Sequence, residues 1–114
     1  MKEEPILTNL ITELKRGTLT LCVLSQLEEK QYGYSLLQVL CDKHIAIEAN
    51  TLYPLLRRLE TQGLLESSWD TTEARPRKFY SLSSKGRTIL GELATAWREQ
   101  NTHINALLGE ESYA

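Results

Sequence analysis

One stretch of the sequence decides the fold: NTLYPLLRRLETQG, residues 50–63. Its leucines recur at steps of three and four residues, which is the spacing of one face of a helix. The pattern predicts a helix over residues 50–62, because Gly63 stands where helices often end in a left-handed residue. Pro54 is expected in or near the first turn, where a missing N–H costs little. The leucines expected to hold this helix to a core are Leu52, Leu55, Leu56 and Leu59.

The opposite face of the same helix is polar and cationic. Asn50, Tyr53, Pro54 and Arg57 share one helical spacing, and Arg58 lies beside them. Such a face donates hydrogen bonds, stacks and carries positive charge, which suits a helix that reads the major groove of DNA. The plain alternative is a solvated helix face that binds nothing, and Arg58 is equally explained as a solubility charge.

A β-hairpin is predicted over residues 64–82, with alternating strands on either side of a polar turn at residues 71–76. Trp69 is expected to pair across the strands with Phe79 or Tyr80. The C-terminal side of the tip is basic, and basic side chains in this position meet phosphates or the minor groove. The three cations concerned are Arg75, Arg77 and Lys78.

Two further helices are predicted before this unit. The apolar spacing from Leu10 to Leu27 predicts a largely buried helix, although Gly17 interrupts it and leaves a separate or bent arm as the alternative. A second helix is expected over residues 33–44, with Cys41 on its buried face. The order helix, helix, helix, hairpin, helix is that of a winged helix-turn-helix. The expected fold class is therefore mainly α (α+β), with a two-stranded wing.

The last predicted helix begins at Ser83 or Ser84 and extends to about Leu108. At 1.5 Å per residue it is about 36 Å long, which is more than one small core can cover. A second copy of the chain is the simplest partner for its far half, since most small oligomers are symmetric dimers. We expect residues 1–83 to form the DNA-binding unit and residues 84–114 a dimerisation helix with a short tail. The apolar stripe on this helix includes Leu90, Leu93, Ala94, Trp97, Ile104 and Leu108.

Composition fits a single soluble domain of 114 residues. The net charge of −2 argues at first against a nucleic-acid partner, but residues 48–87 carry seven basic and five acidic side chains, a local net charge of +2. A local surface that binds anions is therefore compatible with the negative net charge of the whole chain. No apolar run reaches the length of a membrane span and no secretory signal is present, so the cytoplasm is the expected location.

Metal binding and catalysis find little support in the sequence. Cys41 and His44 have the spacing of a metal pair, but a second pair that would complete a tetrahedral site is lacking. Neither His44 nor His103 has a recognisable catalytic constellation, so we expect no enzyme, no metal and no cofactor. The remaining alternative is a winged-helix module that binds protein, for which the net charge of −2 is the best argument. Such a module has no need of a basic wing tip.

Several of these stretches resemble the PadR-like transcriptional regulators. Residues 50–60 (NTLYPLLRRLE) with Gly63 and Leu64 are similar to the family's recognition-helix motif. Residues 15–24 resemble its first helix, residues 32–34 the start of its second, and residues 75–82 the return strand of its wing. The short C-terminal helix is similar to that of the family's small members. The Gly-rich wing tip of many members is replaced here by Glu73-Ala74-Arg75.

The resemblance implies a homodimeric regulator, usually a repressor, that binds a two-fold operator and responds to a small molecule or to stress. It implies an interface between two C-terminal helices, here involving Leu93, Trp97, Ile104 and Leu108. Trp97 matches a tryptophan that stacks on planar hydrophobic ligands in some small members, although an aromatic residue on an apolar stripe is more often interface core. The residues that the resemblance places at or near double-stranded DNA are Asn50, Thr51, Tyr53, Pro54 and Arg57, with Arg75, Arg77 and Lys78 in the wing.

Overall fold

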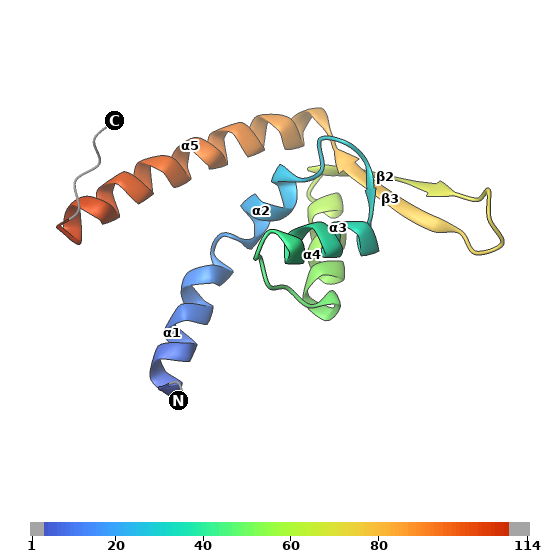
Figure 1. Cartoon of the computed structure of the whole chain (residues 1–114). Helices are drawn as coiled ribbons and strands as arrows, with labels where there is room; N and C mark the ends of the chain where they lie inside the picture. Colours follow the sequence, from blue (N-terminus) through green and yellow to red (C-terminus); the bar gives the residue numbers. More distant parts are fainter. Residues whose placement is uncertain (1–3, 110–114) are drawn as a thin grey trace.

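The computed structural model describes residues 4–109 (Figure 1). It has a mixed α and β architecture in which α2, α3 and α4 cluster at one end of a small antiparallel sheet, the β2–β3 hairpin projects from this body, and a long helix leaves it on the other side (Figure 1). The first three residues of the expected DNA-binding unit, and the last five of the expected C-terminal segment, lie outside the described residues. The elements in chain order are α1 (Pro5–Arg16), α2 (Leu19–Ser25), β1 (Gln31–Tyr32), α3 (Gly33–Asp42), α4 (Ala49–Thr61), β2 (Leu65–Asp70), β3 (Arg77–Leu82) and α5 (Ser84–Leu107).

The core lies where α2, α3 and α4 meet the sheet. All four leucines predicted for α4 are buried, which confirms the periodicity that predicted this helix. A fully buried leucine contributes about 2 kcal/mol, so these side chains fix the orientation of α4 in the body. They pack in one cluster with Val23, Leu24, Leu27, Leu36, Leu40, Ile47, Leu64, Leu65, Tyr80 and Leu82.

The continuous buried helix predicted over residues 10–27 is wrong. Gly17 separates α1 from α2, and only α2 sends side chains into the core. Leu10 and Leu14 are exposed, Leu14 to 74%, and α1 projects from the body as an arm (Figure 1). The arm predicted as the alternative is therefore the structure adopted. The apolar period was correct, but nothing within the described residues covers the stripe.

The C-terminal end of α4 follows from local chemistry, and both ends lie one residue earlier than predicted. Gly63 has φ +82°, and the bonds from Gly63 N to the Glu60 carbonyl (2.9 Å) and from Leu64 N to the Leu59 carbonyl (3.0 Å) close the helix as predicted. The helix begins at Ala49, so Pro54 lies in the second turn rather than in the first, which corrects the expected position. The missing N–H of Pro54 leaves the Asn50 carbonyl without its usual donor.

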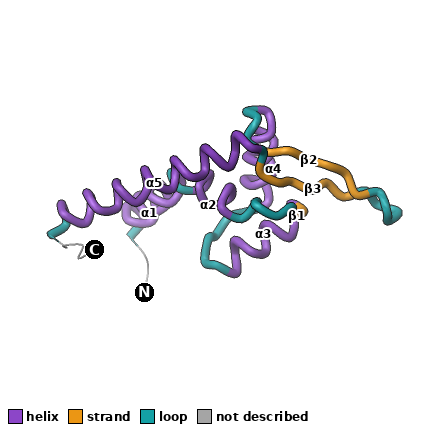
Figure 2. The backbone as a smooth tube through the Cα atoms, turned by 90° about the horizontal axis from the view of Figure 1, so that it is seen from above, coloured by secondary structure: helices purple, strands orange, loops and turns teal. Residues whose placement is uncertain are grey.

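The sheet has the order β1-β3-β2 and includes one strand that the sequence pattern did not predict (Figure 2). Tyr32 of β1 lies opposite Phe79 of β3. Trp69 lies opposite Lys78, so the expected pairing of Trp69 with Phe79 or Tyr80 is wrong by one residue. Two-residue strands carry too short an alternation to be recognised from sequence.

The end of α3 also differs from the prediction. The helix ends at Asp42 rather than at His44, which adopts a left-handed conformation with φ 68°. Cys41 is exposed rather than buried, and its thiol donates a weak hydrogen bond to the Ile47 carbonyl at 3.9 Å. Among residues 4–109, no group of three or more metal-ligating side chains is positioned to hold a metal ion.

Helix α5 is anchored only at its start. The Ser83 hydroxyl accepts from Gly86 N (2.9 Å) and donates to the Gly63 carbonyl (2.6 Å), so one side chain joins the end of α4 to the beginning of α5. Gly86 lies so close to Leu64 that an added Cβ would be 2.1 Å from the Leu64 carbonyl oxygen. Leu90 still packs partly against the core, and beyond it α5 extends away from the body (Figure 1). None of the described helices has the length and apolar character needed to cross a bilayer.

Candidate nucleic-acid interface

The polar face of α4 is open along its N-terminal half. Asn50, Thr51, Pro54 and Arg57 are all exposed, because the leucines on the opposite face hold the helix to the core. Tyr53 is half-buried. The structure therefore places the five predicted residues of this helix on one side, four of them free to meet a ligand and one at a packing contact.

Tyr53 packs against the start of α3. A Cβ added to Gly33 would lie 2.3 Å from Cε1 of Tyr53, so the ring occupies the space that a side chain would need. Gly33 is thus required for the close approach of α3 and α4. The side chain of Tyr53 also borders a hollow between α4 and the wing.

The first turn of α4 offers hydrogen-bonding groups to a ligand. Glu48 precedes the helix without a side-chain hydrogen bond to it. The first backbone N–H groups of a helix lack intrahelical acceptors, and they carry the positive end of its dipole. Together with the side chains of Asn50 and Thr51, this turn suits the negatively charged, acceptor-rich surface of a DNA groove.

The tip of the wing is shaped by Asp70. Its Oδ1 accepts from the backbone N–H of Thr72 at 3.0 Å and from the Thr72 hydroxyl at 2.7 Å, and its Oδ2 accepts from the Tyr32 hydroxyl at 3.0 Å. The bond from the Thr72 hydroxyl is the main cause of a lowered pKa at Asp70. The side chain of Asp70 therefore holds the beginning of the turn in place without a glycine.

The two arginines of the wing have different surroundings. Arg75 is exposed at the tip, and no hydrogen bond or ion pair holds it within the part of the chain described. Arg77 forms an ion pair with Glu73 at 3.1 Å, and its guanidinium lies 4.2 Å from the ring centroid of Tyr32. Exposed pairs of this kind contribute at most about 1 kcal/mol, so Arg77 can exchange its carboxylate for a phosphate.

Lys78 lies away from the tip, under the wing. Its ammonium donates to Oε1 of Glu60 in α4 at 3.1 Å. The side chains of both residues are about one third exposed. Lys78 is therefore engaged with α4, whereas Arg77 pairs with Glu73 of the wing and Arg75 is exposed at the tip.

A hollow of about 310 Å³ lies between α3, α4 and the wing. It brings together residues distant in sequence, including Tyr53 of α4 and the predicted wing cations Arg77 and Lys78. Strand β1, which the sequence pattern did not predict, brings Tyr32 to this hollow. Tyr32 stacks on Phe79 with ring centroids 3.9 Å apart, which ties β1 to the root of the wing.

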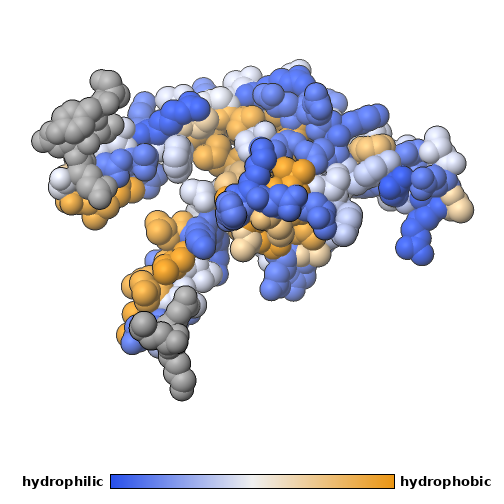
Figure 3. Space-filling model, in the orientation of Figure 1, coloured by the Kyte–Doolittle hydropathy of each residue, from blue (hydrophilic) through white to orange (hydrophobic). Residues whose placement is uncertain are grey.

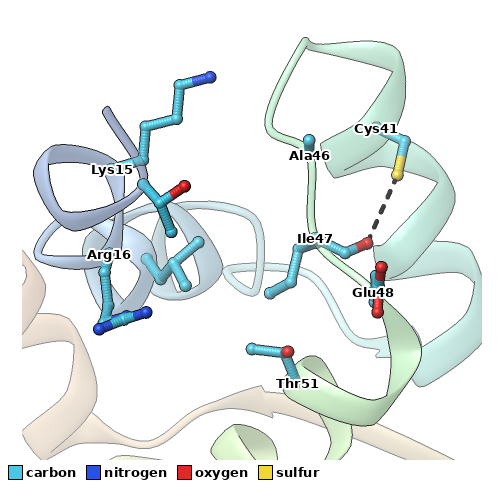
Figure 4. Close-up of a pocket in the computed structure, with 9 residues that line it drawn as sticks. Lys15, Arg16, Cys41, Ala46, Ile47, Glu48 and Thr51 are labelled. Atoms are coloured by element: carbon cyan, nitrogen blue, oxygen red, sulfur yellow. Dashed lines mark hydrogen bonds between the residues drawn. The ribbon is translucent and has the colours of Figure 1, made fainter. Parts of the chain in front are cut away.

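A second cavity, of about 500 Å³, separates the last turn of α1 from the start of α4 (Figure 4). Lys15 and Arg16 extend from the α1 side, and Cys41, Ile47 and Thr51 line the opposite side (Figure 4). The cavity places the arm beside the beginning of the open face, so the two regions are neighbours.

Two apolar surfaces remain exposed on the helices that leave the body. Figure 3 shows one over α1 and another near the far end of α5. On α5 they include the predicted interface residues, with Trp97 exposed to 45%. Contiguous apolar patches on a small protein mark interaction sites. The exposed side chains are Ile6, Leu7, Leu10, Ile11 and Leu14 on α1, Leu93, Trp97, Ile104 and Leu107 on the part of α5 beyond Leu90, and Leu108 directly after that helix.

Comparison with known proteins decides the family. Residues 21–92 match the transcriptional regulator PadR-like family. The chain belongs to this family. As a PadR-like protein it is a DNA-binding transcriptional regulator, and this membership favours DNA binding over the alternative of a protein-interaction module. The members of the family are transcriptional regulators, not enzymes, and typically dimerise.

Individual relatives of this PadR-like chain cover nearly its whole length. It is 33% identical over 102 residues to the transcriptional regulator Rv3488 of Mycobacterium tuberculosis, covering 89% of this chain and 92% of the relative. A PadR family regulator from Eggerthella lenta has 48% identity and a TM-score of 0.86, with 90% and 92% of the two chains covered. A PadR-like transcription factor from Bacteroides fragilis has 36% identity and a TM-score of 0.73, with 87% and 98% covered. The winged-helix fold predicted from sequence is confirmed.

Proposed function

We propose that this PadR-like protein is a homodimeric cytoplasmic repressor that inserts α4 into the major groove of a two-fold operator. The observation that carries the proposal is the open polar face of α4 beside a basic wing. Asn50, Thr51 and Arg57 are exposed on a helix whose other face is locked in the core, and Arg75 and Arg77 extend from the hairpin next to it.

Each residue of this face has a defined task in the proposal. The carboxamide of Asn50 and the guanidinium of Arg57 have the geometry to bind adenine and guanine edges in a bidentate manner. Thr51, Tyr53 and Pro54 contact the adjoining backbone or the thymine methyl groups. Because wing cations suit phosphates and narrow minor grooves, contacts there are assigned to Arg75 and Arg77.

Dimerisation is assigned to residues 84–114, with α1 as a second contributor. The support is the exposed stripe on α5, where Leu93, Trp97, Ile104 and Leu108 find no cover within the described residues. A two-fold dimer sets its two recognition helices about one turn of DNA apart, which matches a palindromic operator.

Relief of repression is assigned to a planar hydrophobic small molecule that binds at Trp97 between the two α5 helices. The support is the half-exposed indole on an otherwise apolar stripe. Such a ligand changes operator affinity only if it binds one arrangement of the dimer better than the other. An effector that leaves operator affinity unchanged would contradict this part of the proposal.

The test of the function is binding to the chain's own upstream promoter DNA, with a scrambled duplex as the control. We expect sequence-dependent binding whose logarithm falls linearly with the logarithm of salt concentration. Arg57→Ala should weaken binding by about 1–3 kcal/mol and relax specificity at one base pair, while Arg58→Ala, on the edge of the face, serves as the matched control. Equal and weak binding to both duplexes would contradict the proposal.

A further inference from the structure

One carboxylate joins the wing to the recognition helix. Glu60 lies on the same side of α4 as Arg57, three residues farther on, near the end of the helix. Its Oε1 accepts from Lys78 Nζ at 3.1 Å, and its Oε2 accepts from the Ser67 hydroxyl. Since Ser67 belongs to β2 and Lys78 to β3, the carboxylate contacts both strands of the wing at once. We call these three residues the Glu60 clamp.

The clamp lies on the face of the wing that is turned toward α4. Strand alternation places Ser67, Trp69, Lys78 and Tyr80 on this face, because Ser67 is paired with Tyr80 and Trp69 with Lys78. The Lys78 ammonium is 5.1 Å from the ring centroid of Tyr80 and 5.9 Å from that of Trp69. It is therefore surrounded by one carboxylate and two ring faces.

The electrostatics agree with a formed ion pair. The Ser67 hydroxyl and then the Lys78 ammonium lower the pKa of Glu60, and the Glu60 carboxylate raises the pKa of Lys78. Charge-assisted hydrogen bonds are shorter and stronger than neutral ones, and here they connect two elements that are otherwise joined through the core. A side chain held in this way on three sides is poorly placed to contact a phosphate.

We infer that Glu60 is a wing-positioning residue, which fixes the angle between the wing and α4 so that Arg75 and Arg77 reach DNA while α4 occupies the major groove. In this arrangement Lys78 serves the clamp and not a phosphate. The part of the inference that concerns DNA rests on the proposed function. The clamp itself is a property of the free protein, and it is testable without DNA.

The inference makes a prediction opposite in sign to that of simple electrostatics. Removing a negative charge near a DNA-binding face strengthens binding if only the field of the protein matters. Glu60→Gln removes that charge but also the ion pair with Lys78, so we expect operator binding to weaken about tenfold. Glu66→Gln is the matched control, because Glu66 is an exposed β2 residue on the other face of the wing, and its loss should leave binding unchanged or tighter.

A charge exchange separates positioning from direct contact. Lys78→Glu places two carboxylates together and should weaken binding, and the double variant Glu60→Lys with Lys78→Glu should recover most of the loss. If Lys78 instead contacts a phosphate, the double variant stays as weak as Lys78→Glu. In that case the slope of log affinity against log salt also falls by about one in Lys78→Met.

A measurement on the free protein completes the test. The chain has two tryptophans, so two indole N–H signals are expected in a nitrogen–proton correlation spectrum, and Trp69→Phe assigns them. Glu60→Gln should shift the Trp69 signal and leave the Trp97 signal in place, whereas Glu66→Gln should shift neither. An unchanged Trp69 signal overturns the clamp. If the Trp69 signal shifts but operator binding is unchanged or tighter, the Glu60 clamp exists and has no role in DNA binding, which overturns that part of the inference. If even the wild type binds no operator, the proposed function fails while the indole signals still decide whether Glu60 holds the wing.

Discussion

The helices of the winged-helix body and the two helical arms are alike in carrying an apolar stripe, but the stripe is buried in the body and exposed in the arms. In α4, Leu52, Leu56 and Leu59 are each 1% exposed or less. In α1 the equivalent stripe is exposed, and so is the stripe on the part of α5 beyond Leu90. We call α1 and this part of α5 the arms. An apolar stripe on a helix therefore does not by itself show whether the rest of the same chain buries that stripe. The body buries its apolar residues within itself, whereas the stripes of the arms are not covered within the described residues.

The largest expected difference in stability is between replacing a leucine of the body with alanine and replacing a leucine of an arm with alanine. Leu56→Ala leaves a cavity in a closed core and should lower the free energy of unfolding by about 3 kcal/mol at any protein concentration. Leu10→Ala should destabilise only where copies associate, so its effect should grow with concentration. Urea unfolding of both variants at two concentrations a tenfold step apart makes the comparison. A large effect of Leu10→Ala that does not depend on concentration would contradict it.

Two glycines of α5 locate the boundary between body and arm. An alanine at Gly86 collides with the Leu64 carbonyl, whereas nothing within 4 Å meets a Cβ at Gly91. Gly86→Ala should therefore destabilise by about 2 kcal/mol. Gly91→Ala should stabilise the protomer by about 0.5–1 kcal/mol through helix propensity. Thermal unfolding of the two variants measures the difference, and equal shifts in Tm would place the boundary elsewhere.

A smaller effect on the free energy of unfolding should appear at acidic pH, and it should come from the body. The pKa of Glu60 is held below its usual 4.5, chiefly by the Ser67 hydroxyl, so the folded state binds the proton less readily than the unfolded state. Its stabilisation is thus complete above pH 4.5 and is lost as the pH falls through the lowered value. Because the pair is partly exposed, the loss should stay under about 1 kcal/mol.

Urea unfolding at neutral and at acidic pH checks this prediction. Wild type should lose more stability between the two conditions than Glu60→Gln, which has no carboxylate left to protonate. Glu66→Gln is again the matched control and should follow the wild type. Identical acid sensitivity of wild type and Glu60→Gln would mean that the Glu60 clamp contributes nothing to the fold.

Much of the body could be predicted from the sequence because its signals are local. The period of Leu52, Leu55, Leu56 and Leu59 and the left-handed stop at Gly63 are readable from neighbouring residues alone. Some corrections are shifts of one or two residues at helix ends, but the missing strand β1 concerns a contact between residues far apart in the chain. The pairing of β1 with β3 depends on where residues separated by more than forty positions meet, and no local pattern reports that.

In the candidate interface, too, local features could be predicted from the sequence and contacts between distant residues could not. The exposed face of α4 could be predicted because it is the complement of the buried one. Lys78 could not be placed, since its partner Glu60 lies eighteen positions earlier and on another element. A hint was present in Glu60 itself, which continues the spacing of Asn50, Tyr53 and Arg57 and so had to lie on the polar side of the helix, away from the buried leucines. An acid at that position needs a cation nearby.

The most direct test of the division between body and arms is the assembly of the operator complex. Wild type should protect two patches about one helical turn apart in a hydroxyl-radical footprint, with two protomers bound per operator. A variant carrying Leu10→Asp on α1 and Ile104→Asp on α5 should keep its fold, sediment as a monomer and lose the paired footprint, because a charge in each arm opposes the association. A monomer that still protects both patches, or a dimer that persists in this variant, would contradict the account.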